Sequence, residues 1–287
     1  LIYGRGAADM KGGIAAFVAA VRRYLATDKL TGSLSLIITG DEEADAINGT
    51  VKMVDWMRQT DNIPDFCLVG EPTNPSALGQ TIKNGRRGSL TCALAVKGRQ
   101  GHVAYPHFAT NPVPALFAML EPVNSAKLDG GTDYFGPSTA EVTHLNIADP
   151  ASNVIPDKAF AQFNIRFNTE HTTDSLQGWL DEHFTRIASQ LEVQYEARFW
   201  SNASPFITEA SAHLDVVKSA IRTVTGQSPE LSTTGGTSDA RFISSLCPVA
   251  EFGLVGQTMH QVDEHVSLAD IETLTDIYFE MIRQMDR

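Results

Sequence analysis

The stretch LSLIITGDEEAD, residues 34–45, joins an apolar run to three consecutive acids. Its apolar half predicts a strand over residues 33–39 that is buried on both faces, as in a parallel sheet covered by helices. The acids at 41–43 then fall where that strand ends. Adjacent carboxylates repel one another, and burying them unpaired is costly. A short acidic cluster usually lies in solvent; the alternative is that it faces a bound metal ion or a group of arginines.

The flanking sequence repeats this alternation of helix and strand. Residues 10–26 place apolar side chains at helical spacing, and a second helix is expected near 48–59. DFCLVGEPT, residues 65–73, is a further buried strand, and it too ends in an acid, Glu71. The fold class that follows is α/β, with a mostly parallel sheet and helices on its faces.

The pattern changes near residue 88. Between 89 and 201 the predicted order is β-α-β-β-α-β, and the strands alternate apolar and polar residues, as in KAFAQFNIRFNT at 158–169. This order and size predict a separate ferredoxin-like domain. After residue 202 the earlier style returns, with a helix over 211–225, a buried strand in PVAEFGLVG and a helix over 267–285 opened by a Ser267/Asp270 capping box. We therefore predict one domain formed by 1–88 and 202–287, with a second domain inserted at 89–201.

Composition limits the function classes. The 287 residues have a formal net charge of −12, which argues against nucleic acid or an anionic membrane as the main partner. There is no stretch of 18 apolar residues long enough to span a membrane. Three distant cysteines without a CxxC pair argue against a disulfide framework and against a cysteine zinc site, and they favour a cytoplasmic protein.

Four candidate positions follow predicted strands or turns: Asp9, the acids at 41–43, Glu71 and His260. In a parallel sheet, functional groups gather beyond the carboxyl ends of the strands. A lone Asp in a glycine-rich turn is more often a helix cap, and a lone loop histidine is more often solvated. Together, however, carboxylates and imidazole without a thiolate suit Zn²⁺, Mn²⁺ or Co²⁺. In such a site Glu43 would be a ligand and Glu42 would be free for proton transfer.

Seven blocks of this sequence resemble the M20 family of metallopeptidases and deacylases. In chain order they are YGRGAADMKGG, TGDEEAD, VGEPT, GRQGHVAYPH, NVIPD, GGTSDARF and MHQVDEHVS. The resemblance covers the whole chain. It implies a zinc-exopeptidase-like catalytic domain with an inserted dimerisation domain that acts as a lid, and a homodimer formed through that lid.

The resemblance also implies roles for residues. Asp9 matches a carboxylate that bridges two metals, Glu42 the general base, and Glu43, Glu71 and His260 the other ligands present. His102 matches an oxyanion donor supplied by the partner's lid. The positions matched to substrate binding are Arg166, Asn153, Gly236, Thr237, Ser238, Lys83, Arg87 and Tyr105. For these the ordinary alternatives stay open, because a strand arginine is usually a surface residue and glycines in TGGTS can simply form a turn.

The implied activity is metal-dependent hydrolysis of an N-succinylated amino acid, with two Zn²⁺ per intact subunit and Co²⁺ or Mn²⁺ as substitutes. The family branch matched best converts N-succinyl-LL-2,6-diaminopimelate and water to succinate and LL-2,6-diaminopimelate in lysine and peptidoglycan-precursor biosynthesis. The alternatives are acetylornithine deacetylation, carboxypeptidase activity, or a metal-poor relative without catalysis.

One departure concerns the start of the chain. The family has a further metal-ligating histidine in an H-x-D motif upstream of the position matched by Asp9, whereas the first histidine here is His102. Leu1-Ile2-Tyr3 also resembles the end of a strand already under way. We therefore expect that a preceding segment is missing, and that this chain alone binds at most one metal well and has little activity.

Overall fold

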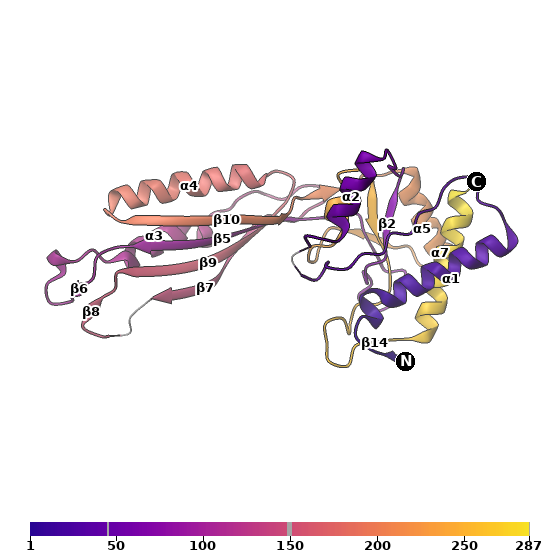
Figure 1. Cartoon of the computed structure of the whole chain (residues 1–287), viewed down its shortest axis with the longest axis horizontal. Coiled ribbons are helices and arrows are strands. Elements are labelled where there is room, and N and C mark those ends of the chain that lie inside the picture. The colour runs from indigo at the N-terminus through magenta and orange to yellow at the C-terminus, as the bar shows by residue number, and fades with distance from the viewer. Residues whose placement is uncertain (45, 148–150, 287) are drawn as a thin grey trace. The chain divides into compact units, whose positions relative to one another are not determined.

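The computed structural model describes residues 1–44, 46–147 and 151–286, and the chain divides into two compact units (Figure 1). The first unit comprises Leu1–Arg86 and Ile207–Arg287, and the second comprises Arg87–Phe206. Both units contain sheets and helices, so the predicted α/β class is confirmed.

The first unit is built on a mixed four-stranded sheet in the order β12-β3-β13-β2. The neighbours β12 and β3 are parallel, as are β13 and β2, while β13 meets β3 in an antiparallel contact at Glu251 and Lys83. The strands of this sheet are short: β2 (Cys67–Val69), β3 (Thr81–Lys83), β12 (Glu230–Ser232) and β13 (Val249–Glu251). Their ends deliver loop residues to a common region, which becomes the candidate site.

Helices surround this sheet and enclose its core. They are α1 (Gly12–Thr27), α2 (Thr50–Gln59), α5 (Ala212–Thr225), α6 (Ala240–Ile243) and α7 (Leu268–Met285). Helix α7 packs against both α1 and α5, and its Leu274, Ile277 and Tyr278 are almost completely buried in the core. The remaining short elements are β1 (Ile2–Tyr3), the turn η1 (Ala7–Lys11), β4 (Gly85–Arg86), β11 (Phe206–Ile207) and β14 (His265–Val266).

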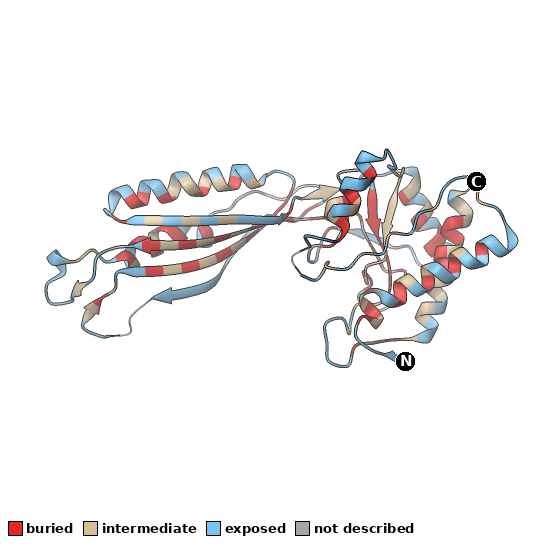
Figure 2. Ribbon diagram, in the orientation of Figure 1, coloured by how far each residue is buried: buried red, intermediate tan, exposed pale blue. Residues whose placement is uncertain are grey.

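The second unit is an antiparallel four-stranded sheet in the order β10-β5-β9-β7. Its elements are β5 (Gly88–Lys97), β6 (Gly101–His102), η2 (Pro106–Phe108), α3 (Pro112–Ser125), β7 (Thr139–Ile147), β8 (Val154–Ile155), β9 (Lys158–Phe167), α4 (Thr173–Gln190) and β10 (Gln194–Ala203). Helices α3 and α4 contact each other, and alternate residues of β5 and β9 are buried, so both helices cover the same face of the sheet (Figure 2).

The periodic patterns of the second unit correctly predicted the order of its four long strands and two long helices, β5, α3, β7, β9, α4 and β10. Cys92 and Leu94 of β5 and Phe163 and Ile165 of β9 are at most 1% exposed. Helix α4 buries Leu176, Leu180, Phe184 and Ile187, as its spacing predicted. A long strand or helix with one apolar face has only one way to bury that face, which is why the sequence signal was sufficient here.

The predicted strand at 33–39 is wrong. This segment forms no strand, pairs with none of the described strands, and leaves Leu36 and Ile38 45% and 61% exposed. An apolar run can be extended without belonging to a sheet, because a strand also needs a neighbour to satisfy its backbone hydrogen bonds.

Two details of the helices also differ from the prediction. Of the large apolar residues that helical spacing placed on the core face of α1, Phe17 and Val21 pack against the core, whereas Val18 and Leu25 are exposed. The residues of α1 that are fully buried include the small Ala16 and Ala20. Small residues form its contact face because α1 and α7 lie close together. Ser267 precedes α7 without a capping hydrogen bond from its side chain, so the predicted capping box is absent.

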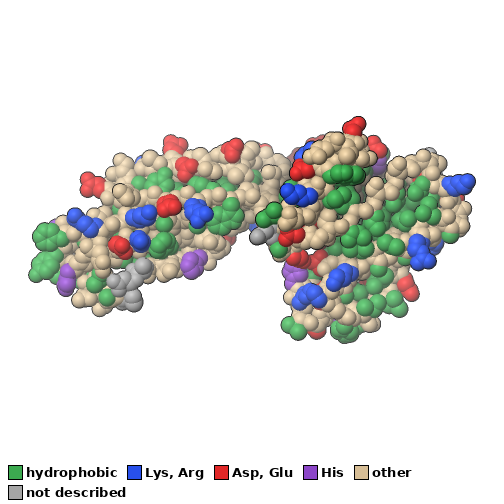
Figure 3. All heavy atoms as spheres, in the orientation of Figure 1, with side chains coloured by type: hydrophobic (Ala, Val, Ile, Leu, Met, Phe, Trp, Pro, Cys, Tyr) green, Lys and Arg blue, Asp and Glu red, His purple; other side chains and the backbone are tan. Residues whose placement is uncertain are grey.

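The surface of both units is mixed in character. On the face drawn in Figure 3, lysine and arginine side chains are scattered among acidic and hydrophobic ones. Among the described residues, no helix is both long and apolar enough to cross a membrane.

Candidate metal centre

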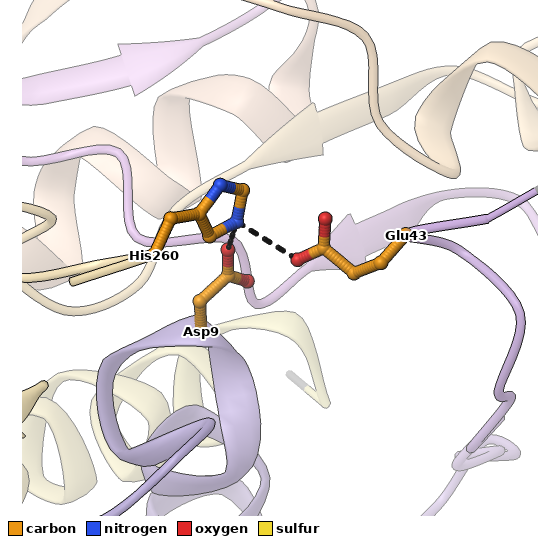
Figure 4. A group of neighbouring side chains, drawn as sticks. All are labelled: Asp9, Glu43 and His260. Atoms are coloured by element: carbon orange, nitrogen blue, oxygen red, sulfur yellow. Dashed lines mark hydrogen bonds and ion pairs between the residues drawn. The ribbon is translucent and has the colours of Figure 1, made fainter. Parts of the chain in front are cut away.

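Asp9, Glu43 and His260 converge on one point of the first unit (Figure 4). The Nε2 atom of His260 lies 3.1 Å from Oδ2 of Asp9 and 3.0 Å from Oε1 of Glu43. One ligand atom from each residue lies within 4.8 Å of the other two. Two carboxylates and one imidazole at this spacing form a donor set that suits Zn²⁺ and related divalent ions.

Close backbone packing places Asp9 beside the end of β2. Asp9 lies in the turn η1, directly before helix α1. At Gly13, in the first turn of α1, a Cβ atom would lie only 2.9 Å from the carbonyl oxygen of Gly70. Glycine at position 13 therefore lets the start of α1 approach Gly70, which lies between the end of β2 and Glu71.

The three consecutive acids have three different roles in the structure. Oδ2 of Asp41 accepts hydrogen bonds from the backbone N–H groups of Ile47 and Asn48, at 2.8 and 3.1 Å, and so closes the loop. Glu43 contacts His260, and Glu42 lines the pocket beside it. The acidic cluster is therefore not simply solvated, because two of its members face a site.

A pocket of about 390 Å³ surrounds this cluster, and all of its lining residues belong to the first unit. Of the residues predicted from sequence, it is lined by Asp9, Glu42, Glu43, Glu71, His260, Lys83, Gly236 and Thr237. Glu71 is outside the group of three ligand atoms within 4.8 Å but lines the same pocket. One end of the pocket is acidic, and Lys83 and Arg86 line it as well.

Burial and crowding of like charges change the acidity of these carboxyl groups. Burial raises the pKa of Glu42 to about 7, with the nearby guanidinium of Arg241 opposing the shift. Burial, and then the charge of Asp9, raise the pKa of Glu71 to about 9. Burial and the charge of Glu43 likewise raise the pKa of Asp9. Carboxylates held together in this way are stabilised by a bound cation, so the residues present fit a metal site.

The pKa of His260 is raised as well, but for an imidazole this favours the charged form. Its hydrogen bond to Glu43 and the charge of that carboxylate raise its pKa, since both favour the protonated imidazole. A metal ion would replace this proton, because imidazole must be neutral to act as a ligand.

Sequence reasoning missed a buried ion pair beside the pocket. Arg86 donates from Nε to Oε1 of Glu251 at 2.9 Å and from a terminal nitrogen to Oε2 of the same carboxylate. Glu251 is completely buried, and it also accepts a hydrogen bond of 2.5 Å from the hydroxyl of Ser238. An acid inside the buried strand PVAEFG was the available signal, since a buried carboxylate needs a partner.

The loop that contains Ser238 packs closely against the guanidinium of this ion pair. Gly235 has a φ of +106°, and a Cβ atom there would lie 2.5 Å from a terminal nitrogen of Arg86. The glycines of TTGGTS therefore do more than form a turn, because one of them makes room for the guanidinium. Arg241 was missed as well; it is 4% exposed, and its Nη1 lies 3.8 Å from Oε1 of Glu42.

Lys83 forms the basic side of the pocket. Its Nζ donates to the hydroxyls of Ser232 and Thr234 at 2.9 and 2.8 Å. Burial and the charge of Arg86 lower its pKa to about 8, so the amine is still mostly protonated at neutral pH. An ammonium group has three N–H donors, which leaves one for a ligand.

The remaining predicted residues belong to the second unit and form two groups within it. His102 lies in β6, which pairs with β8, and its neighbours include Tyr105 and the backbone of Asn153. Arg166 lies at the other end of the sheet, where it is paired with Ser89, and the charge of Arg87 contributes to lowering its pKa after burial. The ten residues of β5 separate the two groups, which corresponds to about 30 Å.

Comparison with known families and curated proteins gives a consistent result. The model of the peptidase family M20/M25/M40 matches residues 1–284. A succinyl-diaminopimelate desuccinylase of Gluconacetobacter diazotrophicus is 52% identical over 287 residues, covering 99% of this chain and 73% of that relative. A protein of the same name from Rhodopseudomonas palustris is 53% identical, covering 97% of this chain and 72% of the relative.

Solved structures with similar folds are more distant in sequence. An aminopeptidase from Bacillus cereus superposes with a TM-score of 0.81 at 16% identity, over 98% of this chain and 72% of that one. An M20 family metallo-carboxypeptidase from Sulfolobus solfataricus has a TM-score of 0.77 at 17% identity, over 99% of this chain and 78% of its own. At such identities the likeness establishes the fold alone.

Proposed function

The chain belongs to the peptidase family M20/M25/M40, and from that membership we propose that it hydrolyses N-succinyl-LL-2,6-diaminopimelate to succinate and LL-2,6-diaminopimelate. The observation that supports this most directly is identity above 50% over nearly the whole chain to proteins named succinyl-diaminopimelate desuccinylase. The pocket adds the groups that such a reaction needs, namely a set of metal donors, a carboxylate that can exchange a proton, and a basic side for an acidic substrate.

Asp9, Glu43, Glu71 and His260 would hold the metal. We propose two Zn²⁺ ions per intact subunit, with Co²⁺ or Mn²⁺ as substitutes, and Asp9 would be the ligand common to both. The convergence of Asp9, Glu43 and His260 supports this assignment, as does the raised pKa of Asp9 and of Glu71 where carboxylates crowd together. When bound, such ions polarise the amide carbonyl and make a water molecule more acidic.

Glu42 would move the protons of the reaction. It takes a proton from the attacking water as the new carbon–oxygen bond forms at the succinyl carbonyl. It then delivers that proton to the amine nitrogen as the carbon–nitrogen bond breaks, so its own charge is restored at the end of the cycle. Its position in the pocket lining, beside the proposed ligand Glu43, supports this role.

The basic side of the pocket would bind a carboxylate of the substrate. Lys83 has a free donor, and Arg86 lines the pocket while its Nε and one terminal nitrogen hold Glu251. Gly236 and Thr237 line the pocket beside them, with Ser238 held to the same Glu251. An acidic protein with a local basic surface inside its pocket is suited to a substrate that has several carboxylates.

We propose that the second unit is a ferredoxin-like dimerisation lid, and that its two residue groups serve different chains of a homodimer. His102 and Arg166 are separated by the length of β5, about 30 Å, which is far longer than an N-succinylated amino acid. If both act on one substrate molecule, they must come from different copies of the chain. His102, with Tyr105 and Asn153 beside it, would then supply the oxyanion donor from the partner.

A cytoplasmic location belongs to the same proposal. The three cysteines, Cys67, Cys92 and Cys247, are free thiols. Free thiols are typical of a reducing compartment.

The test is a comparison of substrates with and without metal. The intact protein, treated with a chelator, is assayed against N-succinyl-LL-2,6-diaminopimelate, N-acetylornithine and a dipeptide, before and after addition of Zn²⁺. We expect Zn²⁺ to restore hydrolysis, with the highest kcat/KM for the succinylated substrate. Faster turnover of N-acetylornithine or of the dipeptide would assign the chain to another activity of the family, and no metal-dependent hydrolysis of any of the three would reject the enzyme assignment.

A further inference from the structure

Glu264 is a buried carboxylate that none of the roles above uses. Its side chain is 2% exposed, and it lies in the loop immediately before β14. Four donors surround its two oxygens, and all of them belong to a single turn at the other end of the chain. They are the backbone N–H of Gly6 at 2.8 Å, of Ala8 at 2.9 Å and of Asp9 at 3.1 Å, and the Nη1 of Arg5 at 3.1 Å.

This arrangement fixes the backbone of the turn rather than a side chain. Gly6 has a φ of +79°, which orients its N–H and those that follow toward the same point. The backbone N–H of Gly4 also donates to the carbonyl oxygen of Glu264, at 2.9 Å. Burial alone would raise the pKa of Glu264, but the backbone hydrogen bonds outweigh this effect and lower it, so the carboxylate is charged at neutral pH.

The same loop contacts Asp9 in two ways. Oε1 of Glu264 accepts from the backbone N–H of Asp9, and four residues earlier the imidazole of His260 contacts its carboxylate at 3.1 Å. The backbone of Asp9 and the direction of its side chain are therefore both determined by the segment 260–264. A residue whose backbone and side chain are both held in this way loses little further conformational freedom when its carboxylate binds an ion.

We propose that Glu264 is a positioning residue that holds Asp9 in place as a metal ligand and thereby sets the metal affinity of the pocket. This inference rests on the proposed function, in which Asp9 is a ligand. A carboxylate that only stabilised the fold would affect unfolding without affecting the affinity for metal. The two roles are therefore separable by experiment.

The test is the variant Glu264→Gln, which has nearly the same size but replaces one acceptor oxygen with an NH₂ group facing N–H donors. Zn²⁺ affinity is measured by competition with a chromophoric chelator, and the Co²⁺ absorption spectrum reports the geometry of the ligands. We expect affinity about 10- to 100-fold below wild type and an altered Co²⁺ spectrum. Glu280→Gln is the matched control, because Glu280 is a buried glutamate on α7 whose carboxylate accepts from Arg283 and Gln284 away from the pocket; it should keep wild-type affinity.

Asp9→Ala separates the two levels of the proposal. If Asp9→Ala weakens Zn²⁺ binding while Glu264→Gln leaves affinity and spectrum unchanged, this inference is wrong and the metal site stands. If Asp9→Ala has no effect either, the ligand assignment itself fails. Should Glu264→Gln not fold, Glu264→Asp is measured in its place, with the same expected direction. Failure of both variants to fold would overturn the positioning role in favour of a purely structural one.

Discussion

Glu42 and Glu43 are neighbours in the sequence with different surroundings. Glu43 is exposed and contacts His260, whereas Glu42 is half-buried and lies near the guanidinium of Arg241. The third acid of the run, Asp41, accepts hydrogen bonds from two backbone N–H groups of its own loop. The proposed metal ligand and the proposed proton carrier therefore occupy consecutive positions in different surroundings.

The clearest residue-level prediction is for Glu42→Gln. An amide cannot accept the proton of the attacking water, so we expect kcat to fall by at least about 10²- to 10⁴-fold, while Zn²⁺ content per chain stays at the wild-type level. Steady-state kinetics with elemental analysis check both parts. Glu43→Gln is the comparison, because it should lower the affinity for metal instead. A Glu42→Gln variant that keeps a tenth of the wild-type rate would exclude the base role.

At the scale of elements, the ion pair of Arg86 and Glu251 ties the basic side of the pocket to β13. Arg86→Met leaves the fully buried Glu251 without its cation, and we expect the free energy of unfolding to fall by about 3–5 kcal/mol. Urea denaturation measures this. Lys97→Met removes an exposed pair with Glu196 and should cost less than about 1 kcal/mol.

A double variant tests the reason for that loss. Arg86→Met combined with Glu251→Leu removes both charges, so it should be more stable than Arg86→Met alone. If the double variant is less stable than the single one, the cost comes from packing rather than from an unpaired buried charge.

Asp129 is expected to make the stability of the second unit depend on pH. Burial acts to raise its pKa, but hydrogen bonds from Ser138, Gly131 and Asn168 outweigh this and lower it to about 2. The folded pKa is below the ordinary value of 3.8, so the stabilisation is complete above about pH 4 and is lost as the pH falls toward 2. Its size is about 2 kcal/mol.

Urea denaturation between pH 2 and 6 checks this prediction. Asp129→Asn should show a smaller loss of stability across that range than wild type. Asp133→Asn, an exposed position in the same loop, should retain the wild-type pH dependence. Equal pH dependence in wild type and Asp129→Asn would contradict the assignment.

Much of the architecture could be predicted from local patterns. The ten-residue strands β5 and β9 and the helix α4 each have one strongly apolar face. In such elements the spacing of apolar residues along the sequence identifies the type of secondary structure. The prediction for 33–39 failed because an apolar run does not by itself provide the neighbouring strand that a sheet requires. The face of α1 was misjudged because a close helix contact selects small residues such as Ala16 and Ala20 over larger ones.

The candidate site was predictable to a similar extent. Acids and a histidine after predicted strands or turns indicated Asp9, Glu43, Glu71 and His260, and all four line one pocket. The buried carboxylates beside the pocket, Glu251 and Glu264, could not be assigned partners from local sequence patterns. Glu264 bonds to residues more than 250 positions away, and no local pattern encodes such a partner.

At the scale of the whole molecule, the proposed homodimer makes a prediction about mixed chains. Glu42→Gln and His102→Ala are each expected to be nearly inactive alone. If His102 acts on the pocket of a partner, a hybrid dimer has one pocket with both groups intact. Random mixing then restores up to about a quarter of wild-type activity.

The measurement is activity after the two variants are mixed and allowed to exchange subunits. Mixing Glu42→Gln with Glu42→Lys is the control, because no pocket in that hybrid has a base. Absence of recovery in a sample shown to contain hybrid dimers would place His102 and Glu42 of one chain at the same site.

The first unit is assembled from two stretches of chain, Leu1–Arg86 and Ile207–Arg287, with the whole second unit between them. Asp9 and His260, which are 251 positions apart, must meet before the pocket exists. During synthesis the acidic residues emerge from the ribosome long before the histidine that completes their group. Closing so long a loop is slow, so metal capture should be among the last events of folding, and the nascent chain should expose an incomplete set of donors until translation is nearly finished.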